Sequence, residues 1–455
     1  MIGTDTERLI LGLGKTGYSI AAWLAGQGKS FRVIDTREQP PHAEAVRALC
    51  PEDRLHFGGW QQDWLATANE LYVSPGLALS EPHISAALAR GAELVSDIDL
   101  YRQESQVPVI AVTGSNGKST VVRLLEKIAQ DLGFQALAGG NIGRPVLELL
   151  QEPHDLAVLE LSSFQLEMTH ALKADVAMVL NISPDHQDRY ADMSAYRAAK
   201  HRIFRDCQGI VVHADDPLTQ PLVSEQMPRR DYSVCRHDLG LLSLTVTADG
   251  LQLRDGLEVL HTWDSLYLKG SHNHLNILAA LSAGLLRGWP LAEMVHSVAE
   301  FRGLPHRCAW AGEVAGVTYI NDSKGTNVGA TLAALEGLAP ECSGHLHLLA
   351  GGDGKNADFT PLGRACAEGS VRLQTYGRDG ARIASAAQQQ GVTATRHETL
   401  EAAFQAARRK AEPGDWIVLS PACASFDQFA GFEARGEAFE ALVGSLQAST
   451  REVSP

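Results

Sequence analysis

The sequence has little of what a disulfide scaffold, a zinc finger or a membrane protein needs. Its seven cysteines are scattered, and no two of them form a C-x-x-C pair. This scatter argues against both a disulfide framework and a zinc site, and it fits a reducing cytoplasm. No apolar run reaches membrane-spanning length, and the first residues lack a basic region ahead of a long apolar stretch. We therefore expect neither export nor membrane anchoring.

Positive charge is also in short supply. The chain has 39 lysines and arginines against 54 aspartates and glutamates, which gives a net charge of −15. General attraction to nucleic acid or anionic lipid is therefore not expected, and an anionic ligand needs local basic groups. With 455 residues and 45% hydrophobic content, the chain is long enough for about three packed domains. We expect small-molecule partners, no nucleic-acid or membrane partner, and a monomer.

Short apolar runs alternate with helical stretches along the chain, which is the pattern of parallel α/β units. The runs RLILGLG, FRVID and ELYVSPG predict a Rossmann-like domain over residues 1–96. A second series, from VPVIAVTG to HLNILAALSAGLLRG, predicts a central P-loop ATPase-type domain with a parallel sheet over 97–303. A third, from VTYINDS to DWIVLSP, predicts another Rossmann-like domain over 304–455. The predicted fold class is α/β with three domains.

Residues 109–120 read VIAVTGSNGKST and carry the clearest functional signal. Glycines let backbone N–H groups approach phosphate oxygens, Lys118 supplies a mobile positive charge, and the Ser119 hydroxyl can bind Mg²⁺. The eight-residue Walker pattern has a glycine where this sequence has Val112, so only the shorter form G-x-x-G-K-[ST] is matched. A strand–turn–helix connection with a chance lysine is the plain alternative, but an apolar strand and a helix flank the loop as a P-loop requires. We expect a nucleoside triphosphate site at Gly114, Ser115, Asn116, Gly117, Lys118, Ser119 and Thr120.

A second glycine loop near the N-terminus raises a rival interpretation. Gly12, Gly14 and Gly17 form G-x-G-x-x-G after a predicted strand, and Asp35 lies about where a dinucleotide-binding acidic residue would. An NAD-dependent oxidoreductase is therefore an alternative, although such an enzyme has no evident use for the P-loop. A nucleotide-gated binding module is another. Because NAD and UDP-sugars share a pyrophosphate, the loop could instead hold a substrate.

Two other predicted strands end in polar residues. DLAVLELSS stops being apolar at Glu160, and VAMVLNISPDHQDRY does so just before Asp185, His186 and Asp188. If both strands lie beside the P-loop strand, these side chains converge at the carboxyl edge of the sheet, and Glu160 and His186 become candidate metal partners. Taken alone, each is better explained as a solvated strand-end carboxylate or a loop cap.

Lys200, in SAYRAAKHRIFRDC, falls on the apolar face of a predicted helix. Helical spacing places it with Tyr196, Ile203 and Phe204. A lysine that snorkels to solvent is the default explanation. The alternative is a lysine near the nucleotide that carries a CO₂-derived carbamate, an anionic oxygen ligand suited to Mg²⁺. The sequence leaves both open.

Taken together, eight segments resemble the Mur ligase family, most closely its D-glutamate-adding members. They are TGSNGKST, LELSSFQLE, DHQDRY, YRAAKHRIF, SHNHLN, NDSKGTN, LLAGGDGKNADF and SPACASFDQF. The resemblance implies a ligase that uses ATP and two Mg²⁺ ions to join D-glutamate to UDP-N-acetylmuramoyl-L-alanine through an acyl phosphate, in cytoplasmic peptidoglycan precursor synthesis. A related Mur or folylpolyglutamate-type amide ligase with another amino acid is the nearest alternative.

The resemblance also implies a role for individual residues, and it reassigns GLGKTG from NAD to UDP. It implies that Lys118, His186 and Lys200 are catalytic, and that Ser119, Glu160, His186 and carbamylated Lys200 hold the metal ions. It implies UDP-substrate contacts at Gly14, Lys15, Thr16, Asp35, Thr36, Arg37, Asn141 and His186. Beyond the P-loop, it implies ATP contacts at Asn273, Asn276, Arg307, Asp322 and Lys324. It implies D-glutamate contacts at Thr326, Lys355, Ser425 and Phe432.

Charge supports the last set independently, because a dicarboxylate amino acid needs cationic and hydroxyl donors such as Lys355 and Ser425. From the residues alone, Lys355 is equally a solvated turn lysine, Ser425 a helix cap and Phe432 a core residue. The resemblance implies a small residue at Gly325 beside the ligand. Ligands spread over three domains further imply that the C-terminal domain closes and excludes water.

Overall fold

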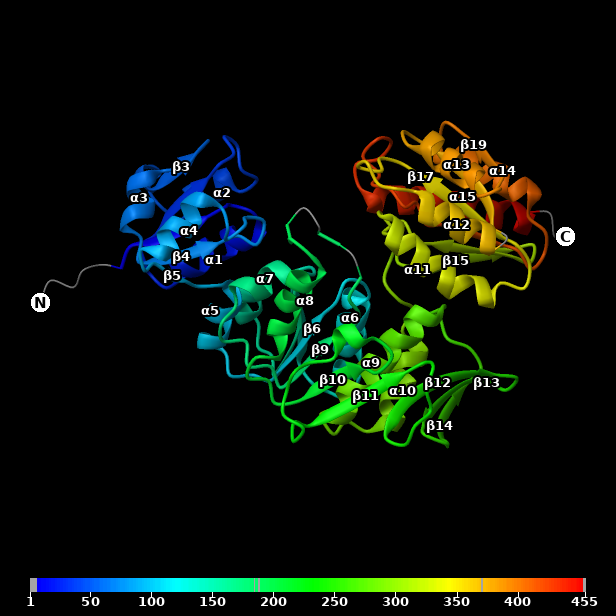
Figure 1. Cartoon of the computed structure of the whole chain (residues 1–455), viewed down its shortest axis with the longest axis horizontal. Helices are drawn as coiled ribbons and strands as arrows, with labels where there is room; N and C mark the ends of the chain where they lie inside the picture. Colours follow the sequence, from blue (N-terminus) through cyan, green and yellow to red (C-terminus); the bar gives the residue numbers. More distant parts are fainter. Residues whose placement is uncertain (1–5, 184, 187–188, 370, 453–455) are drawn as a thin grey trace, which may run out of the picture. The chain divides into compact units, whose positions relative to one another are not determined.

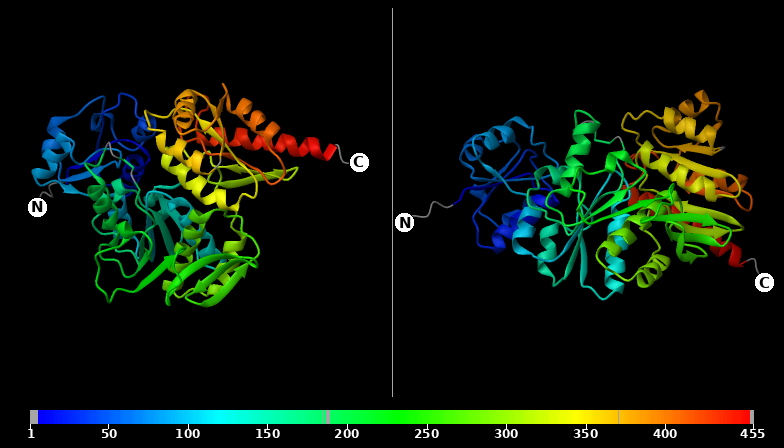
Figure 2. Two further views of the ribbon diagram at one scale, coloured as in Figure 1. Left: turned by 45° about the vertical axis from the view of Figure 1, so that its right-hand side comes forward. Right: turned by 60° about the horizontal axis from the view of Figure 1, so that its bottom comes forward.

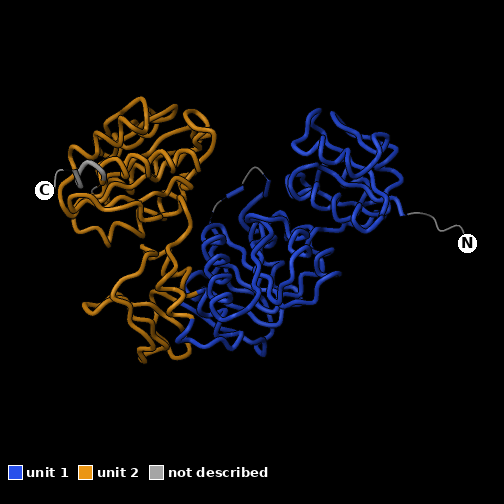
Figure 3. Tube along the Cα trace, turned by 180° about the vertical axis from the view of Figure 1, so that it is seen from behind, with its two compact units in different colours: residues 1–232, 279–293 blue, residues 233–278, 294–455 orange. Residues whose placement is uncertain are grey.

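Figure 1 and Figure 2 show the elements of the chain, which a computed structural model describes over residues 6–183, 185–186, 189–369 and 371–452. The chain forms two compact units, residues 1–232 with 279–293 and residues 233–278 with 294–455 (Figure 3). Among the described residues, no helix is both long and apolar enough to cross a membrane. Three separate β-sheets organise the chain, and this confirms the predicted α/β class.

The first sheet lies in the first unit and is parallel, in the order β3-β2-β1-β4-β5. It buries both faces, with Leu9 and Leu11 in one core and Ile10 and Val33 in another, as helices on both sides of a sheet require. Strand order reverses between β1 and β4, so the carboxyl ends of these two strands flank the crevice in which such folds bind ligands. Its elements are β1 (Arg8–Leu11), α1 (Lys15–Gly26), β2 (Arg32–Asp35), α2 (Ala43–Arg47), β3 (Leu55–Phe57), α3 (Gln62–Thr67), β4 (Glu70–Val73), α4 (Pro82–Ala89) and β5 (Glu93–Leu94).

The second sheet positions the P-loop. Its parallel strands run in the order β11-β10-β9-β6-β8-β7, so the P-loop strand β6 lies between β8 and β9. The ends of β8, which carries Glu160, and of β9, which leads to Asn181, therefore flank the P-loop strand, as predicted from the sequence. The elements are α5 (Asp97–Glu104), β6 (Val109–Thr113), α6 (Lys118–Asp131), β7 (Ala136–Gly140), β8 (Leu156–Glu160), α7 (Ser163–Met168), β9 (Val176–Val179), α8 (Met193–His201), β10 (Ile210–His213) and β11 (Arg229–Ser233).

The second unit holds three antiparallel strands that the sequence analysis did not anticipate. They are β12 (Leu241–Thr247), β13 (Gly250–Asp255) and β14 (Glu258–Trp263). Asp-Gly dipeptides occupy both turns, and Gly250 and Gly256 have positive φ of 122° and 57°. Glycine permits these conformations without a Cβ clash, which is why Asp-Gly favours tight hairpins. Helices α9 (Ser271–Leu286) and α10 (Leu291–Glu300) follow.

A third sheet completes the second unit, in the order β15-β16-β20-β17-β18-β19. Only the β15–β16 pair is antiparallel. The long helix α15 packs against β15 and β16, as Figure 2 shows in red. The elements are β15 (Ala309–Val314), β16 (Val317–Asn321), α11 (Val328–Leu338), β17 (Leu346–Gly351), α12 (Thr360–Glu368), β18 (Arg372–Tyr376), α13 (Gly380–Gln389), β19 (Ala394–Arg396), α14 (Leu400–Lys410), β20 (Trp416–Leu419) and α15 (Phe432–Glu452).

Candidate functional site

The loop between β6 and α6 has the geometry of an anion site. Gly117, with φ of +83°, turns the chain into α6, so the N–H groups of the first helical turn lie directly after the glycine loop. The loop is braced from the end of β9, because the Ser115 and Asn116 N–H groups donate to the Asn181 carbonyl and side-chain oxygens at 3.0 and 2.8 Å. Lys118 Nζ lies back over the loop and donates to the carbonyls of Gly114 and Ser115 at 2.8 and 2.9 Å. A positive charge and a helix N-terminus therefore meet at one point.

Glu160 lies directly beside this loop and is buried, with 3% of its surface exposed. Its Oε2 accepts the Ser119 hydroxyl at 2.7 Å, and its Oε1 accepts the Asn141 side-chain amide at 2.8 Å. The alternative of a solvated strand-end carboxylate is therefore wrong. A carboxylate and a hydroxyl at this separation are the oxygen donors that Mg²⁺ prefers, so the residues present fit a magnesium ion.

Lys200 is buried, as the helical spacing predicts, with only 1% of its surface exposed. Its Nζ donates to the Gly114 carbonyl at 2.9 Å, the same oxygen that Lys118 contacts, and lies 4.6 Å from the centroid of the Tyr196 ring. Burial, followed by the nearby Lys118 charge, lowers the pKa of Lys200 to about 7. A snorkelling lysine is therefore excluded, and burial favours the uncharged, nucleophilic amine.

His186 lies on the same side of the P-loop, in a loop with positive φ of 51°. Its ring packs edge-on against Phe164 with centroids 4.7 Å apart, and it lies 6.1 Å from Tyr196. The side chain is 42% exposed and has Asp185 Oδ2 3.6 Å from its Nε2. It is therefore accessible to a ligand. Asp188 lies outside the described residues.

Within the described ranges, no three His, Cys, Asp or Glu side chains gather closely enough to hold a metal ion. The predicted ligand set does not depend on such a group, because it combines a hydroxyl, a carboxylate, an imidazole and a modified lysine.

The first glycine loop is shaped by close packing. A Cβ on Gly17 would lie 1.9 Å from the Gly12 carbonyl oxygen, so α1 can approach the loop only through glycine. Asp35 accepts the Leu13 N–H at 2.7 Å and the Arg37 guanidinium at 2.7 and 2.9 Å. Burial alone would raise the pKa of Asp35, but the Arg37 and Leu13 hydrogen bonds outweigh it and hold that pKa below its ordinary value.

These contacts occupy the Asp35 carboxylate with hydrogen bonds inside the protein, whereas other residues predicted to contact the UDP substrate are accessible to solvent. Both Asp35 oxygens are used by Leu13 and Arg37, so the carboxylate is poorly placed to receive the ribose hydroxyls of a dinucleotide. Lys15, Thr36 and Arg37 are exposed beside it, and Gly14 and Thr16 are half-buried.

In the second unit, the predicted residues of NDSKGTN follow β16. Asp322 is buried, where its Oδ1 accepts the Cys308 N–H at 3.1 Å and its Oδ2 accepts the Ser420 hydroxyl at 2.7 Å. Burial raises the pKa of Asp322 to about 6. The Lys324 ammonium lies 3.9 Å from the centroid of the Phe432 ring. Gly325 must be small because a Cβ there would come within 2.6 Å of the Asp322 carboxylate, so the constraint comes from this packing.

The remaining predicted D-glutamate residues lie on loops that meet this one. Asp353 and Ala424 exchange backbone hydrogen bonds of 2.9 and 2.8 Å, which ties the loop of Lys355 to the loop of Ser425. Lys355 is exposed with φ of +48°, and Ser425 is buried. The structure thus brings together the loops after β16, β17 and β20, at the carboxyl edge of the third sheet.

Asn273 and Asn276 lie on α9 and bond to each other at 3.1 Å, and both are buried. They share the second unit with Arg307, Asp322 and Lys324, whereas Lys118 and Ser119 lie in the first.

Comparison with known proteins gives three consecutive family matches. Residues 6–96 match the Mur ligase MurD-like N-terminal domain, 112–284 the Mur ligase middle domain, and 306–423 the Mur ligase glutamate ligase domain. Proteins named UDP-N-acetylmuramoylalanine–D-glutamate ligase are similar over nearly the whole chain. The one from Marinobacter nauticus is 45% identical, covering 98% of this chain and 100% of its own. The one from Nitrosococcus oceani is 48% identical, covering 96% of each.

The chain belongs to the Mur ligase family. Solved structures agree on the fold of this Mur ligase. A pseudomurein peptide ligase type C from Methanothermus fervidus superposes with a TM-score of 0.60 at 18% identity, covering 96% of this chain and 100% of its own. UDP-N-acetylmuramate-alanine ligase from Thermotoga maritima gives a TM-score of 0.59 at 16% identity, covering 97% and 99%. The oxidoreductase and binding-module alternatives are excluded by this membership.

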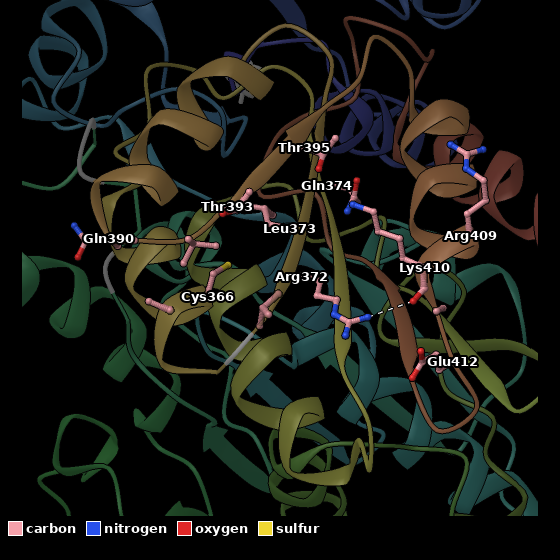
Figure 4. Close-up of a pocket in the computed structure, with 15 residues that line it drawn as sticks. Cys366, Arg372, Leu373, Gln374, Gln390, Thr393, Thr395, Arg409, Lys410 and Glu412 are labelled. Carbon is pink, nitrogen blue, oxygen red and sulfur yellow. Dashed lines mark hydrogen bonds between the residues drawn. The ribbon is translucent and has the colours of Figure 1, made fainter.

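A cavity of about 860 Å³ in this Mur ligase lies apart from the predicted residues, between the ends of α12, α13 and α14 (Figure 4). Several of its polar groups are used by the fold. Arg372 donates to the Lys410 carbonyl at 3.2 Å and so caps α14, and Gln374 bonds to His397 at 2.8 Å. Arg409 and Lys410 belong to the last turn of α14, where cations favour the helix dipole. This cavity therefore adds nothing to the candidate site.

Several residues that shape the site were missed from the sequence. Asn181 braces the P-loop, and its signal was a polar residue just after an apolar strand. Ser420 holds Asp322, again directly after a strand. Arg435 is completely buried in α15, and its signal was a helical spacing of three and four that puts it on the face of Phe432 and Phe439.

Proposed function

We propose that this Mur ligase joins D-glutamate to UDP-N-acetylmuramoyl-L-alanine with hydrolysis of ATP to ADP and phosphate, in cytoplasmic peptidoglycan precursor synthesis. The supporting observation is similarity at 44–48% identity, over nearly full length, to proteins that carry this activity in their names. The contacts around Lys118, Glu160 and Lys200 supply the chemistry that the reaction needs.

The first step needs a phosphate acceptor site with positive charge. The terminal carboxylate oxygen of the UDP substrate attacks the γ-phosphorus of ATP, and the bond from that phosphorus to the β–γ bridging oxygen breaks. In this proposal Lys118 leaves the loop carbonyls and neutralises the γ-phosphate, while the α6 N-terminus holds the other phosphates. Mg²⁺ bound at Ser119 and Glu160 would reduce the repulsion between carboxylate and triphosphate.

The second step forms the amide. The amine of D-glutamate attacks the acyl carbon, phosphate leaves, and the nitrogen loses a proton. Phosphorylation is required because an oxide ion is a poor leaving group. We assign D-glutamate to Thr326, Lys355, Ser425 and Phe432, at the carboxyl edge of the third sheet, and its two carboxylates need the cationic and hydroxyl donors of this set, such as Lys355 and Ser425. His186, half exposed beside the P-loop, is assigned to substrate orientation or to deprotonation of the amine.

Lys200 is assigned to a carbamate. Its Nζ is buried, close to the P-loop, and its pKa of about 7 makes the neutral amine available to CO₂. A carbamate adds an anionic oxygen ligand, and with His186 it would complete a second Mg²⁺ site. Lys200→Ala should be nearly inactive and should regain activity with a short-chain carboxylic acid. Absence of rescue would contradict the carbamate.

The UDP moiety is assigned to the crevice between β1 and β4, with Gly14, Lys15, Thr16, Asp35, Thr36 and Arg37 around it and Asn141 and His186 toward its sugar and peptide. Arg37 is supported by its exposed position beside Asp35, which holds its guanidinium in place. We further propose that the chain has three domains, 1–96, 97–303 and 304–455, and that it acts as a monomer. Each of these domains carries one of the three family matches.

The test is phosphate release from ATP and Mg²⁺ with UDP-N-acetylmuramoyl-L-alanine and one amino acid at a time. We expect release with D-glutamate and none with L-glutamate, L-lysine or meso-diaminopimelate. Release with another amino acid would move the chain to a different activity within the family. Phosphate release that is equal with and without the UDP substrate would contradict the proposal.

A further inference from the structure

Arg435 is the largest fully buried side chain of the described residues, with 0% of its surface exposed. It lies one turn into α15 and donates three hydrogen bonds. Its Nε bonds to Ser323 Oγ at 3.0 Å, one terminal nitrogen to the Ser323 carbonyl at 2.8 Å, and the other to the Cys423 carbonyl at 3.1 Å. One guanidinium therefore holds two chain segments that are 100 residues apart in sequence.

No described carboxylate forms an ion pair with Arg435. A buried cation without an opposite charge is costly, and its hydrogen bonds only partly offset the loss of hydration. An arginine used only to fill a core could be replaced by an apolar side chain of similar volume at no such cost. The guanidinium is therefore explained by what its hydrogen bonds hold in place.

Both segments that Arg435 holds carry residues assigned to substrates. Ser323 lies between Asp322 and Lys324, which are assigned to ATP, and three residues before Thr326. Cys423 lies two residues before Ser425, which is assigned to D-glutamate. The fork of Arg435 spans the two segments because its nitrogens are fixed in one plane, so it sets their spacing as well as their proximity.

The start of α15 makes further contacts with the first of these segments. The Ser323 hydroxyl donates to the Phe432 carbonyl at 2.8 Å, and the side-chain amide of Asn321 donates to the Gly436 carbonyl at 3.1 Å and to Glu440 at 2.7 Å. A Cβ on Gly436 would come within 2.1 Å of the His306 ring, so this end of α15 fits closely against the segment. The helix therefore provides a rigid base for the Arg435 side chain.

We propose that Arg435 is a positioning residue for D-glutamate, because it fixes the 321–327 segment relative to the 423–425 segment. The inference rests on the proposed function for the identity of the ligand. It predicts that loss of the three guanidinium hydrogen bonds weakens D-glutamate binding. Binding of the UDP substrate, which is assigned to the first unit, should be unchanged.

The test compares Arg435→Lys with Val443→Ala. Lysine keeps the charge but cannot donate to three acceptors in one plane. Val443 is also fully buried on α15, in an apolar cluster that includes no residue of either segment, so its truncation tests loss of helix packing. We expect Arg435→Lys to raise the KM for D-glutamate by about tenfold, the effect of losing one charge-assisted hydrogen bond, and to leave the KM for the UDP substrate within about twofold. Val443→Ala should change neither KM.

Hydrogen exchange supplies a readout that does not need activity. The Asp322 and Ala424 N–H groups bond to Leu419 and Asp353 carbonyls at 2.7 and 2.8 Å. We expect both amides to exchange faster in Arg435→Lys than in Val443→Ala at equal loss of Tm. Unchanged exchange would overturn the positioning role even if the proposed ligase activity were absent. Faster exchange with an unchanged KM for D-glutamate in an active enzyme would overturn it as well.

Discussion

Single residues at the P-loop have their surroundings set by neighbouring strand ends. Glu160 is the last residue of an apolar strand, and its position at the carboxyl edge could be predicted once that strand was placed beside β6. The sequence also contained the signal for a buried Lys200. It did not reveal that Lys118 and Lys200 share the Gly114 carbonyl, because that contact depends on how α8 crosses the sheet.

Glu160→Gln tests whether the carboxylate charge is needed. Glutamine keeps the shape and can still accept one hydrogen bond from Ser119 or Asn141, so the fold should persist. We expect kcat to fall by at least about 100-fold, because a neutral amide binds Mg²⁺ poorly. Phosphate release and thermal unfolding are measured together. The control is Glu152→Gln, an exposed residue paired with Arg144, and activity equal to this control would contradict the role of Glu160.

Asp97, the first residue of α5, should make the stability of the folded protein depend on pH. Burial, with a smaller contribution from Asp99, raises its pKa to about 7, and its Oδ2 has no hydrogen-bond partner among the described residues. The folded state therefore holds an extra proton between about pH 4 and 7, so stability falls as pH rises through that window. Asparagine cannot ionise. Relative to wild type, the Tm of Asp97→Asn should be higher at pH 8 than at pH 5.

The control for this prediction is the exposed Asp53→Asn, which removes a charge without burial. An Asp97→Asn difference that is the same at pH 5 and pH 8 would mean that Asp97 does not titrate in this window.

At the scale of elements, the strand–helix alternation predicted the parallel sheets because buried strands of β-branched residues are distinctive. The hairpins β12–β14 were missed although Asp249-Gly250 and Asp255-Gly256 are strong turn signals. Strands β13 and β14 have few buried residues, so no continuous apolar run marks them in the sequence. The hydrogen bonds between α15 and the 321–327 segment could not be predicted, because 109 or more residues separate the bonded residues in the sequence.

Helix α1 contains a matched pair of glycines that tests the first loop. Gly17→Ala places a Cβ 1.9 Å from the Gly12 carbonyl, so the loop must move, whereas a Cβ on Gly26 meets nothing within 4 Å. We expect Gly26→Ala to stabilise the protein by about 0.5–1 kcal/mol. Gly17→Ala should destabilise it by about 2 kcal/mol or more and raise the KM for the UDP substrate. An unchanged KM for the UDP substrate in Gly17→Ala would mean that this loop does not take part in binding it.

At the scale of the whole molecule, the residues assigned to substrate binding are divided between two compact units. Lys118 and Ser119 belong to the first unit, and Asp322, Lys324 and the D-glutamate residues belong to the second. The resemblance predicts all of these assignments, but local sequence patterns carry no information on how separate units move. Because an acyl phosphate must be shielded from water, we expect closure on the substrates to accompany the reaction.

Small-angle X-ray scattering tests this closure directly. We expect the radius of gyration to decrease when a non-hydrolysable ATP analogue, Mg²⁺ and UDP-N-acetylmuramoyl-L-alanine are added together. Lys118→Ala, which lacks the cation for the γ-phosphate, should compact less under the same conditions. An unchanged radius in the wild type would rule out closure as the source of shielding.

The most direct test of the central claim follows one oxygen atom. UDP-N-acetylmuramoyl-L-alanine labelled with ¹⁸O in its terminal carboxylate is incubated with ATP, Mg²⁺ and D-glutamate, and the released phosphate and the product are analysed by mass spectrometry. The account predicts that each released phosphate carries one ¹⁸O and that a D-glutamate residue is added to the UDP substrate, because the carboxylate oxygen leaves with phosphorus. Phosphate without ¹⁸O would show that water attacks ATP, and it would contradict activation of the carboxylate.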